Sequence, residues 1–327
     1  MKNYNWGILG CGKIADPFAE GLKTLPQANL LSVASRSEER AIKLGENFQA
    51  QKLFSNYEDF LKDPDLDIVY VATTHNFHLE HTLLVMQAGK AVLCEKPLTV
   101  NADEARQLVN YARENNIFLM EAFWTRFIPS TIEILKWVQQ GEIGEVRLFK
   151  ADFGYYEPFN PESRSYNPDL AGGALLDVGV YPLNFAYSLF KDDPESWTSL
   201  PSMSSTGIDQ QSAYILKYAS GAMAILNSGV NIRTKHDAWI YGTEGSIYIM
   251  DFFHSRKAII EKKGEKPEEV SLPFESTGYN YEAQEVMRCL DAGLVESPVM
   301  TWNESLRILE LMDRFRNCWG MKYPGEG

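Results

Sequence analysis

The stretch Trp6-Gly7-Ile8-Leu9-Gly10-Cys11-Gly12-Lys13-Ile14-Ala15 decides the fold of this chain. Its first four residues form a short apolar strand, residues 10–15 spell G-x-G-x-x-A, and Ile14–Leu25 has apolar residues at helical spacing. The first glycine permits a tight turn, the second lets a diphosphate approach, and the small third residue lets helix and strand pack closely. A tight turn without a ligand is the alternative. We predict a dinucleotide site that is formed by Gly10, Cys11, Gly12, Lys13 and Ile14, with phosphates bound at the helix N-terminus.

Strand and helix patterns alternate from this stretch as far as residue 122. Alternation of this kind predicts a doubly wound parallel sheet, so residues 1–122 are expected to form a dinucleotide-binding domain of the α/β class. The expected strands are Trp6–Leu9, Leu30–Ala34, Asp67–Ala72, Ala91–Cys94 and Ile117–Met120, and the expected helices are Ile14–Leu25, Glu38–Phe48, His78–Ala88 and Asn101–Tyr111.

The pattern changes in residues 123–327, which we expect to form a substrate-binding and dimerisation domain. Several strands follow one another between Ser204 and Ile260 with short turns, which predicts a large, mainly antiparallel open sheet. One subunit is not expected to cover this sheet fully, which favours a homodimer or a higher oligomer. The other expected elements are a helix at 130–140, a strand at 146–153, an irregular stretch at 155–170, an apolar helix-like segment at 174–190, and helices at 281–290 and 305–316.

Composition excludes several classes of function. The chain has 327 residues with 31 basic and 44 acidic side chains, a net charge of −13, which argues against nucleic acid and anionic membranes as partners. Its four cysteines form no C-x-x-C pair, and no apolar run approaches the ~20 residues of a membrane helix. The polar first residues contain no apolar segment typical of a signal peptide. We therefore expect a cytoplasmic protein with a small-molecule substrate.

The residues about 20 positions after the glycine motif indicate which dinucleotide binds. An acidic residue at this place contacts the ribose of NAD, whereas an arginine accommodates the 2′-phosphate of NADP. Here the sequence reads Ser35-Arg36-Ser37, and Arg40 lies close by. We therefore predict NADP, with Ser35, Arg36 and Arg40 at the phosphate. The alternative is a solvated Arg36 with Glu38 on the ribose of NAD.

Polar residues also follow the strand at 67–72. Ligands gather beyond the carboxyl ends of parallel strands, so Thr73, Thr74, Asn76 and His78 are predicted to meet the cofactor. Three histidines of this segment, at 75, 78 and 81, could be interpreted as metal ligands, but no carboxylate or cysteine completes a set and the first and third, six positions apart, do not share a helix face. We expect no metal.

Cys94-Glu95-Lys96-Pro97 ends the strand at 91–94. A lysine at the carboxyl edge of a central parallel strand points into the ligand crevice. Proline fixes the following turn, and a bond before proline can be cis. The alternative for Lys96 is the usual fate of a lysine, an exposed loop position.

Four motifs in order resemble the glucose–fructose oxidoreductase / inositol dehydrogenase (Gfo/Idh/MocA) family: the glycine motif at 10–15, Glu95-Lys96-Pro97, Gly172–Pro182 and the turn Gly242–Gly245. The resemblance spans nearly the whole chain. It implies a Rossmann domain joined to a domain with a large open sheet, through which subunits often pair. It also implies NAD(P) chemistry on sugars, polyols or related diols, with Lys96 as the catalytic lysine and a cis Lys96–Pro97 bond.

One departure indicates the branch of the family. Many members have D-x-x-x-H where this chain has Asp177-x-x-x-Tyr181, and together with Glu121–Phe127 this tyrosine form resembles the dimeric dihydrodiol dehydrogenase-like branch. The departure puts in doubt a direct transfer of the inositol-type histidine mechanism. The resemblance adds predicted cofactor contacts at Glu95, Lys96, Trp124 and Arg126, and predicted substrate contacts at Lys96, Trp124, Phe153, Tyr155, Asp177 and Tyr181.

The proposed chemistry can be derived from the residue types. Hydride leaves a carbinol only if the hydroxyl proton also leaves, and a tyrosine, with an ordinary pKa of ~10, needs a nearby cation to accept it. Lys96 can supply that cation and Asp177 can orient it or a substrate hydroxyl; the alternative for Tyr181 is a buried core position. We predict an NADP-dependent oxidoreductase acting on CH–OH groups of a sugar, polyol or vicinal diol. The alternatives are a trans-dihydrodiol dehydrogenase and a non-catalytic NADP(H)-binding redox sensor.

Overall fold

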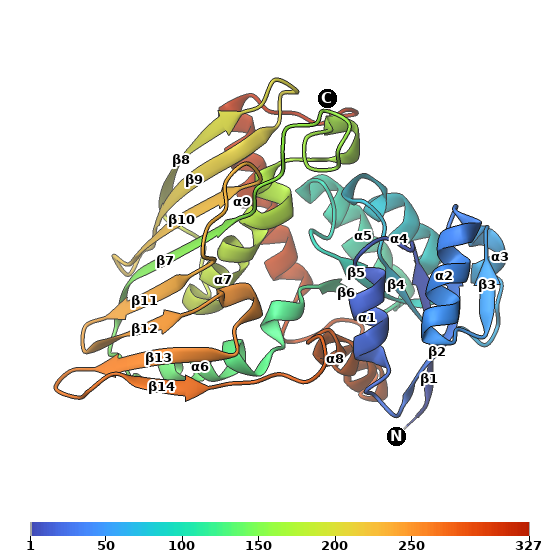
Figure 1. Ribbon diagram of the computed structural model, residues 1–327, viewed down its shortest axis with the longest axis horizontal. Helices are drawn as coiled ribbons and strands as arrows, with labels where there is room; N and C mark the ends of the chain where they lie inside the picture. Colours follow the sequence, from blue (N-terminus) through green and yellow to red (C-terminus); the bar gives the residue numbers. More distant parts are fainter. Residues whose placement is uncertain (1, 327) are drawn as a thin grey trace. The chain divides into compact units, whose positions relative to one another are not determined.

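The computed structural model describes residues 2–326, which divide into two compact units (Figure 1). The first unit contains the residues up to Trp124 together with Glu275–Leu306, and the second contains Thr125–Phe274 together with the residues from Arg307 onward. The boundary after residue 122 remains our proposal for the start of the second domain, while the segment 275–306 belongs to the first unit.

The first unit contains a six-stranded parallel sheet in the order β3-β2-β1-β4-β5-β6. This order confirms the predicted doubly wound sheet and reverses direction between β1 and β4, and ligands of such folds bind beyond the carboxyl ends of the strands at this reversal. The strands are β1 (Tyr4–Leu9), β2 (Ala28–Ala34), β3 (Lys52–Phe54), β4 (Ile68–Val71), β5 (Ala91–Glu95) and β6 (Leu119–Ala122).

Three helices of the first unit begin at a capping side chain, namely Ser37, Asn56 or Asn101. The Ser37 hydroxyl accepts the backbone N–H of Arg40 and the Asn101 side-chain Oδ1 accepts that of Glu104, as expected at helix N-termini. Two elements, β3 and α3, were not predicted, because three- and five-residue segments are too short to display a period. The helices are α1 (Ala15–Leu22), α2 (Glu38–Phe48), α3 (Tyr57–Leu61), α4 (His78–Gln87), α5 (Ala102–Asn115) and α8 (Asn280–Asp291).

The second unit contains an eight-stranded sheet in the order β14-β13-β12-β11-β7-β10-β9-β8. All neighbouring strands are antiparallel except β7 and β10, which confirms the predicted mainly antiparallel sheet. The expected strand region was too narrow, since β8 precedes it and β14 follows it. The strands are β7 (Val146–Gly154), β8 (Ser196–Met203), β9 (Asp209–Lys217), β10 (Met223–Gly229), β11 (Ala238–Gly242), β12 (Gly245–Ile249), β13 (Lys257–Lys262) and β14 (Glu268–Ser271).

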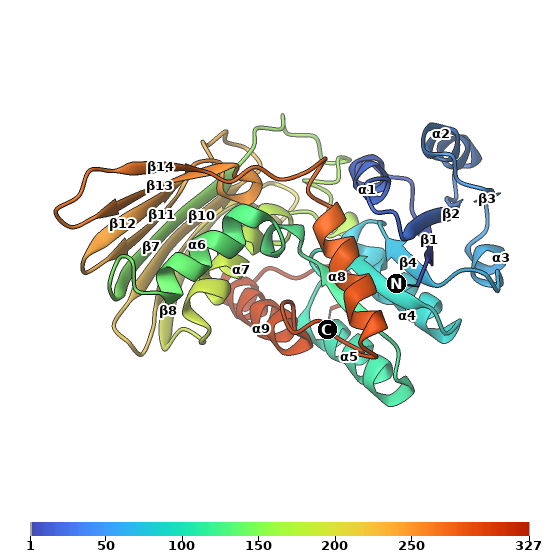
Figure 2. The same ribbon diagram turned by 90° about the horizontal axis from the view of Figure 1, so that it is seen from below.

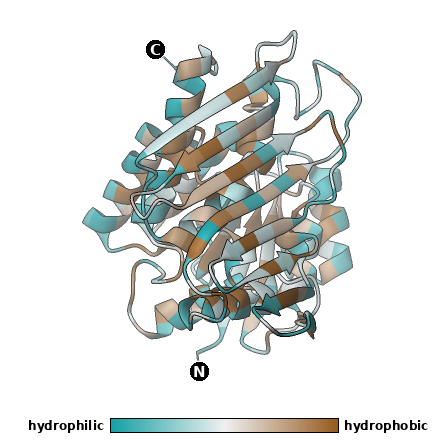
Figure 3. Ribbon diagram, turned by 90° about the vertical axis from the view of Figure 1, so that its left-hand side faces the viewer, coloured by the Kyte–Doolittle hydropathy of each residue, from teal (hydrophilic) through white to brown (hydrophobic). Residues whose placement is uncertain are grey.

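Helices cover one face of this sheet. Figure 2 shows α6 (Pro129–Gln139) and α7 (Val180–Phe190) on that face, and Phe315 of α9 (Trp302–Trp319) stacks on Tyr214 at 5.0 Å. Figure 3 shows the other face without a helix in front of it. Side chains alternate along β9 and β10 accordingly: Leu216 and Leu226 are buried, whereas Ile215 and Ile225 are 39% and 42% exposed.

The apolar segment at 174–190 is not one regular helix. It starts with a π-helical turn, η4 (Leu175–Gly179), and continues as α7. We attribute the irregularity to Pro182, which has no N–H to donate to the carbonyl of Val178. The Asp209 carboxylate accepts the Leu175 N–H at 2.8 Å and so fixes the start of the turn. Such π-helical turns occur frequently at functional sites.

Candidate active site

The glycine motif forms a backbone cradle at the carboxyl end of β1. Gly10 has a φ of +101°, and a β-carbon there would lie 2.8 Å from Thr73 Cγ2 and 2.9 Å from the Ala72 carbonyl oxygen, so only glycine fits. A β-carbon at Gly12 would meet only that carbonyl oxygen, at 3.7 Å. The space beside Gly12 is therefore left open by the protein, as a diphosphate in contact with this backbone requires.

Helix α1 starts directly after the cradle. No side chain caps its N-terminus at Ile14, which suits phosphate oxygens at this place, although the Ala15 N–H itself donates to the Gly12 carbonyl at 3.1 Å. Lys13 is exposed, and Ile14 and Cys11 are half-buried. Burial raises the pKa of the Cys11 thiol to about 11, so it remains neutral next to the cradle. These features fit the phosphates of a dinucleotide.

Ser35, Arg36 and Ser37 connect β2 to α2. The Ser35 hydroxyl accepts the Ser37 N–H at 3.1 Å, and Ser37 caps α2. The guanidinium of Arg36 lies over the Phe77 ring, 4.8 Å from its centroid, while Arg40 is exposed on the first turn of α2. A stacked guanidinium beside a helix N-terminus suits a phosphate monoester. The exposed Glu38 lies on the same turn.

The residues after β4 divide into two groups. The Thr74 hydroxyl donates to Asn76 Oδ1 at 2.7 Å, and both residues are half-buried. His78 is fully buried, with Nδ1 2.8 Å from the Pro97 carbonyl oxygen and Nε2 3.1 Å from that of Thr73. Burial lowers the pKa of His78 to about 4, while its two hydrogen bonds to carbonyl oxygens act in the opposite direction. Its partners indicate that His78 connects the turn after β4 to the turn after β5.

Lys96 follows β5 on a turn that contains the cis Lys96–Pro97 bond. The Glu95 carboxylate accepts the Lys96 N–H at 3.1 Å and also bonds the Tyr70 hydroxyl, and burial raises the pKa of Glu95. Glu121 Oε1 accepts the Leu98 N–H at 3.0 Å. The half-buried Lys96 therefore stands on a backbone that two carboxylates and His78 hold in place.

Trp124 and Arg126 are both buried, each within a different unit. Trp124 stacks on Tyr279 of the first unit at 5.0 Å between ring centroids. Arg126 Nε donates to Asn184 Oδ1 of α7 at 2.6 Å in the second unit. Tyr279 could not be predicted as a neighbour of Trp124, because the segment before α8 carries no motif.

Tyr181 lies in an aromatic cluster of the second unit. Its ring centroid is 5.1 Å from that of Phe153 and 5.7 Å from that of Phe253, and it is 8% exposed. Phe153 also stacks on Phe253 at 4.2 Å and packs against His236 at 4.7 Å. The structure thus brings the predicted Phe153 and Tyr181 together and adds Phe253 and His236, which no sequence pattern marked.

Asp177 lies one turn before Tyr181. Its Oδ2 accepts the Tyr155 hydroxyl at 2.6 Å and the Arg164 guanidinium at 2.9 Å. Asp177 raises the pKa of Arg164 above its ordinary value. The predicted pair Tyr155 and Asp177 is brought together within this unit. Arg164, in the irregular stretch, is an addition that the sequence did not indicate.

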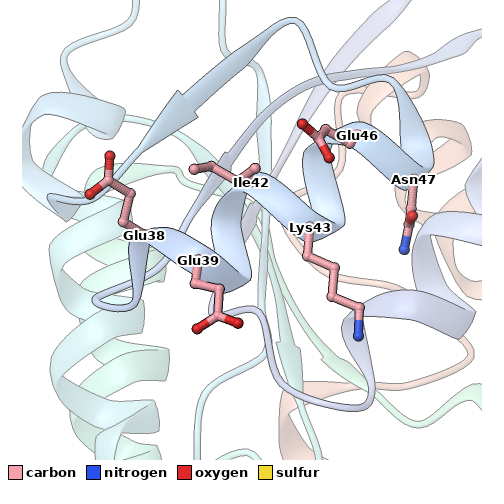
Figure 4. Close-up of a pocket in the computed structure, with 6 residues that line it drawn as sticks. All are labelled: Glu38, Glu39, Ile42, Lys43, Glu46 and Asn47. Carbon is pink, nitrogen blue, oxygen red and sulfur yellow. The ribbon is translucent and has the colours of Figure 1, made fainter.

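Other features of the described residues take no part in this arrangement. No group of three His, Cys, Asp or Glu side chains among residues 2–326 could hold a metal ion. Within the same range, every helix is too short or too polar to cross a membrane. A shallow surface pocket borders α2 alone and contains none of the predicted site residues; it is lined by Glu38, Glu39, Ile42, Lys43, Glu46 and Asn47 (Figure 4).

Comparison with known proteins identifies the family. Residues 4–123 match the oxidoreductase family with an NAD-binding Rossmann fold, and residues 131–248 match the Gfo/Idh/MocA C-terminal domain. This chain therefore belongs to the Gfo/Idh/MocA oxidoreductases, as its motifs predicted. It is an oxidoreductase with an NAD(P)-binding Rossmann fold.

Individual relatives are similar over their whole length. The trans-1,2-dihydrobenzene-1,2-diol dehydrogenase of Xenopus tropicalis is 38% identical, with 98% of this chain and 99% of that protein covered. The human protein of the same name is 33% identical, with 98% of each chain covered. Among solved structures, a 3-ketoreductase from Actinomadura kijaniata in complex with NADP is 26% identical at a TM-score of 0.83, covering 97% of each chain. An aldose-aldose oxidoreductase from Caulobacter crescentus, 23% identical with a TM-score of 0.88 over 98% of each chain, shares the fold.

Proposed function

We propose that this protein is an NADP(H)-dependent oxidoreductase that interconverts a carbinol and a carbonyl carbon, and that its substrate is a cyclic vicinal diol. The observation that carries the proposal is the position of Tyr181, which stands in an aromatic cluster one turn after the hydrogen-bonded Asp177. When bound, the nicotinamide supplies or accepts the hydride.

The roles of Lys96 and Tyr181 follow from the proton that accompanies the hydride. In the oxidative direction the Tyr181 hydroxyl, as phenolate, takes the proton of the carbinol; in the reductive direction it returns that proton. We assign Lys96 as the cation that favours the phenolate, and we propose that the two residues act as one proton-transfer pair. Asp177 orients a substrate hydroxyl or this pair.

The cofactor preference rests on the segment between β2 and α2. The Arg36 guanidinium and the N-terminus of α2 next to it favour a 2′-phosphate, so we propose NADP over NAD. The remaining predicted cofactor contacts stay part of the proposal; they are Gly10, Cys11, Gly12, Lys13, Ile14, Ser35, Arg40, Thr73, Thr74, Asn76, His78, Glu95, Trp124 and Arg126.

The choice of a cyclic diol rests on chemistry and on relatives. Phe153 and Phe253 make the surroundings of Tyr181 apolar, which suits an unsaturated carbocycle better than a fully hydroxylated sugar. The full-length relatives named above are dehydrogenases of trans-1,2-dihydrobenzene-1,2-diol. Aromatic side chains also stack on sugars, and the relative that reduces a 3-keto group keeps a sugar or polyol as the second candidate.

Initial rates test this function directly. The purified protein is assayed with NADP⁺ and with NAD⁺ against trans-1,2-dihydrobenzene-1,2-diol, D-glucose and myo-inositol. We expect NADP⁺ reduction with the diol at the highest kcat/KM. Turnover of a sugar in preference to the diol would show that the substrate is a sugar or polyol. Tight NADPH binding without turnover of any carbinol or carbonyl compound would instead indicate a redox sensor.

We also propose a homodimer formed through the helix-free face of the large sheet. Neighbouring strands place apolar residues opposite one another on this face, for example Ile215 and Ile225, and Trp239 stacks on Tyr248 at 4.4 Å. The exposed Lys150 lies between Ile225 and Trp239, so the apolar side chains form two patches on this face, and exposed apolar patches are typical of interfaces. Light scattering should give twice the chain mass for the wild type and a single chain mass for Ile225→Glu; a wild-type monomer at micromolar concentration would refute the proposal.

The location that we propose is the cytoplasm. The four cysteines support this location, because free thiols are typical of cytosolic proteins: Cys11, Cys94, Cys289 and Cys318 are all free. Fractionation of the source cells with an antibody against the chain tests it.

A further inference from the structure

Four side chains of the second unit form a continuous chain of hydrogen-bonding oxygens. The Asp177 carboxylate accepts the Tyr155 hydroxyl at 2.6 Å, the Tyr155 and Ser165 hydroxyl oxygens are 2.9 Å apart, and Ser165 donates to Glu157 Oε2 at 2.7 Å. Asp177 is one of the residues that we assign to the reaction. Glu157, at the other end, is half-buried.

The number of hydrogens in this chain is informative. There are three oxygen–oxygen contacts, but the two hydroxyl groups supply only two hydrogens when both carboxyl groups are ionised. The contact between Tyr155 and Ser165 then has no hydrogen left. One added proton at either carboxyl group completes all three hydrogen bonds. The chain is therefore built to take up one proton and to pass it in either direction.

The fold holds the four oxygens in this order. Tyr155 follows the end of β7, and the Glu157 N–H donates to the Val230 carbonyl at 2.8 Å. The Gly173 N–H donates to the Ser165 carbonyl at 3.0 Å, and a β-carbon at Gly172 would lie 2.9 Å from that same carbonyl. Gly172 thus permits the close approach that places the buried Ser165 beside Tyr155.

The two ends differ in surroundings. The Asp177 side chain is 8% exposed and also accepts the Arg164 guanidinium, whereas the Glu157 carboxylate bonds Ser165, and its backbone carbonyl accepts the Tyr166 hydroxyl at 3.0 Å. Arg164 and Tyr166 are the titratable groups that the hydrogen bonds and ion pairs place against the ends of the chain. An inner end beside the reactive residues and a more open outer end are the requirements of a proton path.

We propose that Asp177, Tyr155, Ser165 and Glu157 form a proton relay between the reaction site and solvent. The proposal rests on the function proposed above. On carbinol oxidation Tyr181 takes the carbinol proton, and its O–H bond then breaks as the carboxylic O–H bond of Asp177 forms; Asp177 next donates to Tyr155, Tyr155 donates to Ser165, and Ser165 donates to Glu157, which loses the proton to water. Carbonyl reduction runs the same transfers in reverse. Each O–H bond broken is matched by one formed, and no electrons move along the chain.

Ser165→Ala interrupts the relay without removing either end, and Ser163→Ala is its matched control. The Ser163 hydroxyl lies two residues away in the same loop and has no hydrogen-bond partner among the described residues. We expect Ser165→Ala to lower kcat at least about tenfold with little change in KM, and added imidazole to restore most of the loss, because a small acid–base replaces the missing link. Ser163→Ala should behave as the wild type. Ser165→Thr, which keeps a hydroxyl, should retain turnover if its methyl group is accommodated.

Two results would overturn the relay. The first is a wild-type kcat in Ser165→Ala. The second is a loss that imidazole does not restore and that leaves the pH profile and the solvent deuterium isotope effect unchanged, which would show that Ser165 only supports the loop.

A measurement without turnover separates this proposal from the proposed function. Infrared titration follows the Glu157 carboxyl in the wild type, in Asp177→Asn and in Ser165→Ala. The relay requires that Asp177→Asn shifts the Glu157 titration and that Ser165→Ala abolishes this coupling. Independent titration of the two carboxyl groups in the wild type would refute the relay even if the enzyme turns over the diol. Coupling in a protein that reduces no substrate would refute only the function.

Discussion

The two units differ in how their functional residues are built into the sequence. In the first unit the cradle is made by the backbone of six consecutive residues, and Lys96 follows directly on a strand of the same sheet. In the second unit the hydrogen-bond partners of Asp177 lie in an irregular loop. Tyr181 packs against Phe253, which lies 72 residues further along the chain. A site made by backbone appears in the sequence as a motif, whereas a site made by side-chain contacts between distant segments does not.

The largest expected effect is that of a substitution in the second unit, at Tyr181. Tyr181→Phe removes one hydroxyl from an aromatic cluster and leaves the ring contacts with Phe153 intact. We expect kcat to fall by about 10² or more with an unchanged dissociation constant for NADPH, because only proton transfer is affected. Steady-state kinetics and fluorescence titration measure the two quantities. Near-wild-type turnover would eliminate Tyr181 as the acid–base residue.

The next prediction concerns the backbone cradle of the first unit. Gly12→Ala places a methyl group in space that the protein leaves open, so the free energy of unfolding should stay close to that of the wild type while the dissociation constant for NADPH rises about 10- to 100-fold. Gly10→Ala is the contrasting variant, since its β-carbon meets backbone at a positive φ and should destabilise the fold by about 1–3 kcal/mol. Unchanged cofactor affinity in Gly12→Ala would place the diphosphate elsewhere.

Arg36→Ala tests the cofactor preference, for which we expect a smaller effect. Loss of one guanidinium from the 2′-phosphate should weaken NADPH binding about tenfold and leave NADH binding almost unchanged. Isothermal titration with both cofactors gives the ratio. Arg40→Ala is a control on the same helix turn, expected to act more weakly. A wild-type protein that prefers NADH would contradict the proposed NADP preference and would favour the alternative in which Glu38 contacts the ribose of NAD.

The smallest expected effect concerns the start of η4. Burial raises the pKa of Asp209 from its ordinary 3.8 to about 7. The folded protein therefore keeps this proton at pH values where the unfolded chain has lost it, so the stabilisation is complete below pH 3.8, declines as the pH rises, and is lost above about 7. Asp209→Asn keeps an oxygen for the Leu175 N–H and should flatten this slope, which is on the order of 1 kcal/mol per pH unit.

Denaturant unfolding of the wild type and Asp209→Asn between pH 4 and 8 measures this difference in slope. If both proteins show the same pH dependence, Asp209 is not the group that titrates.

How much could be predicted from sequence follows the same division. The parallel sheet, the glycine cradle and the turn at Lys96 could be predicted because each is encoded by neighbouring residues with a backbone requirement, such as the positive φ of Gly10. The large sheet could be predicted from consecutive strand patterns. The hydrogen bonds of Ser165 and Glu157 could not, because they lie in a stretch without periodicity whose conformation depends on contacts with Gly173 and Val230.

A double-mutant cycle tests the central claim most directly, namely that Lys96 of the first unit and Tyr181 of the second act as one proton-transfer pair. The wild type, Lys96→Met, Tyr181→Phe and the double variant are compared by kcat with NADP⁺ and trans-1,2-dihydrobenzene-1,2-diol. We predict that Lys96→Met is at least as damaging as Tyr181→Phe and that the double variant is little worse than the worse single variant. Full additivity of the two losses would contradict the claim, because it would show that the two residues act independently.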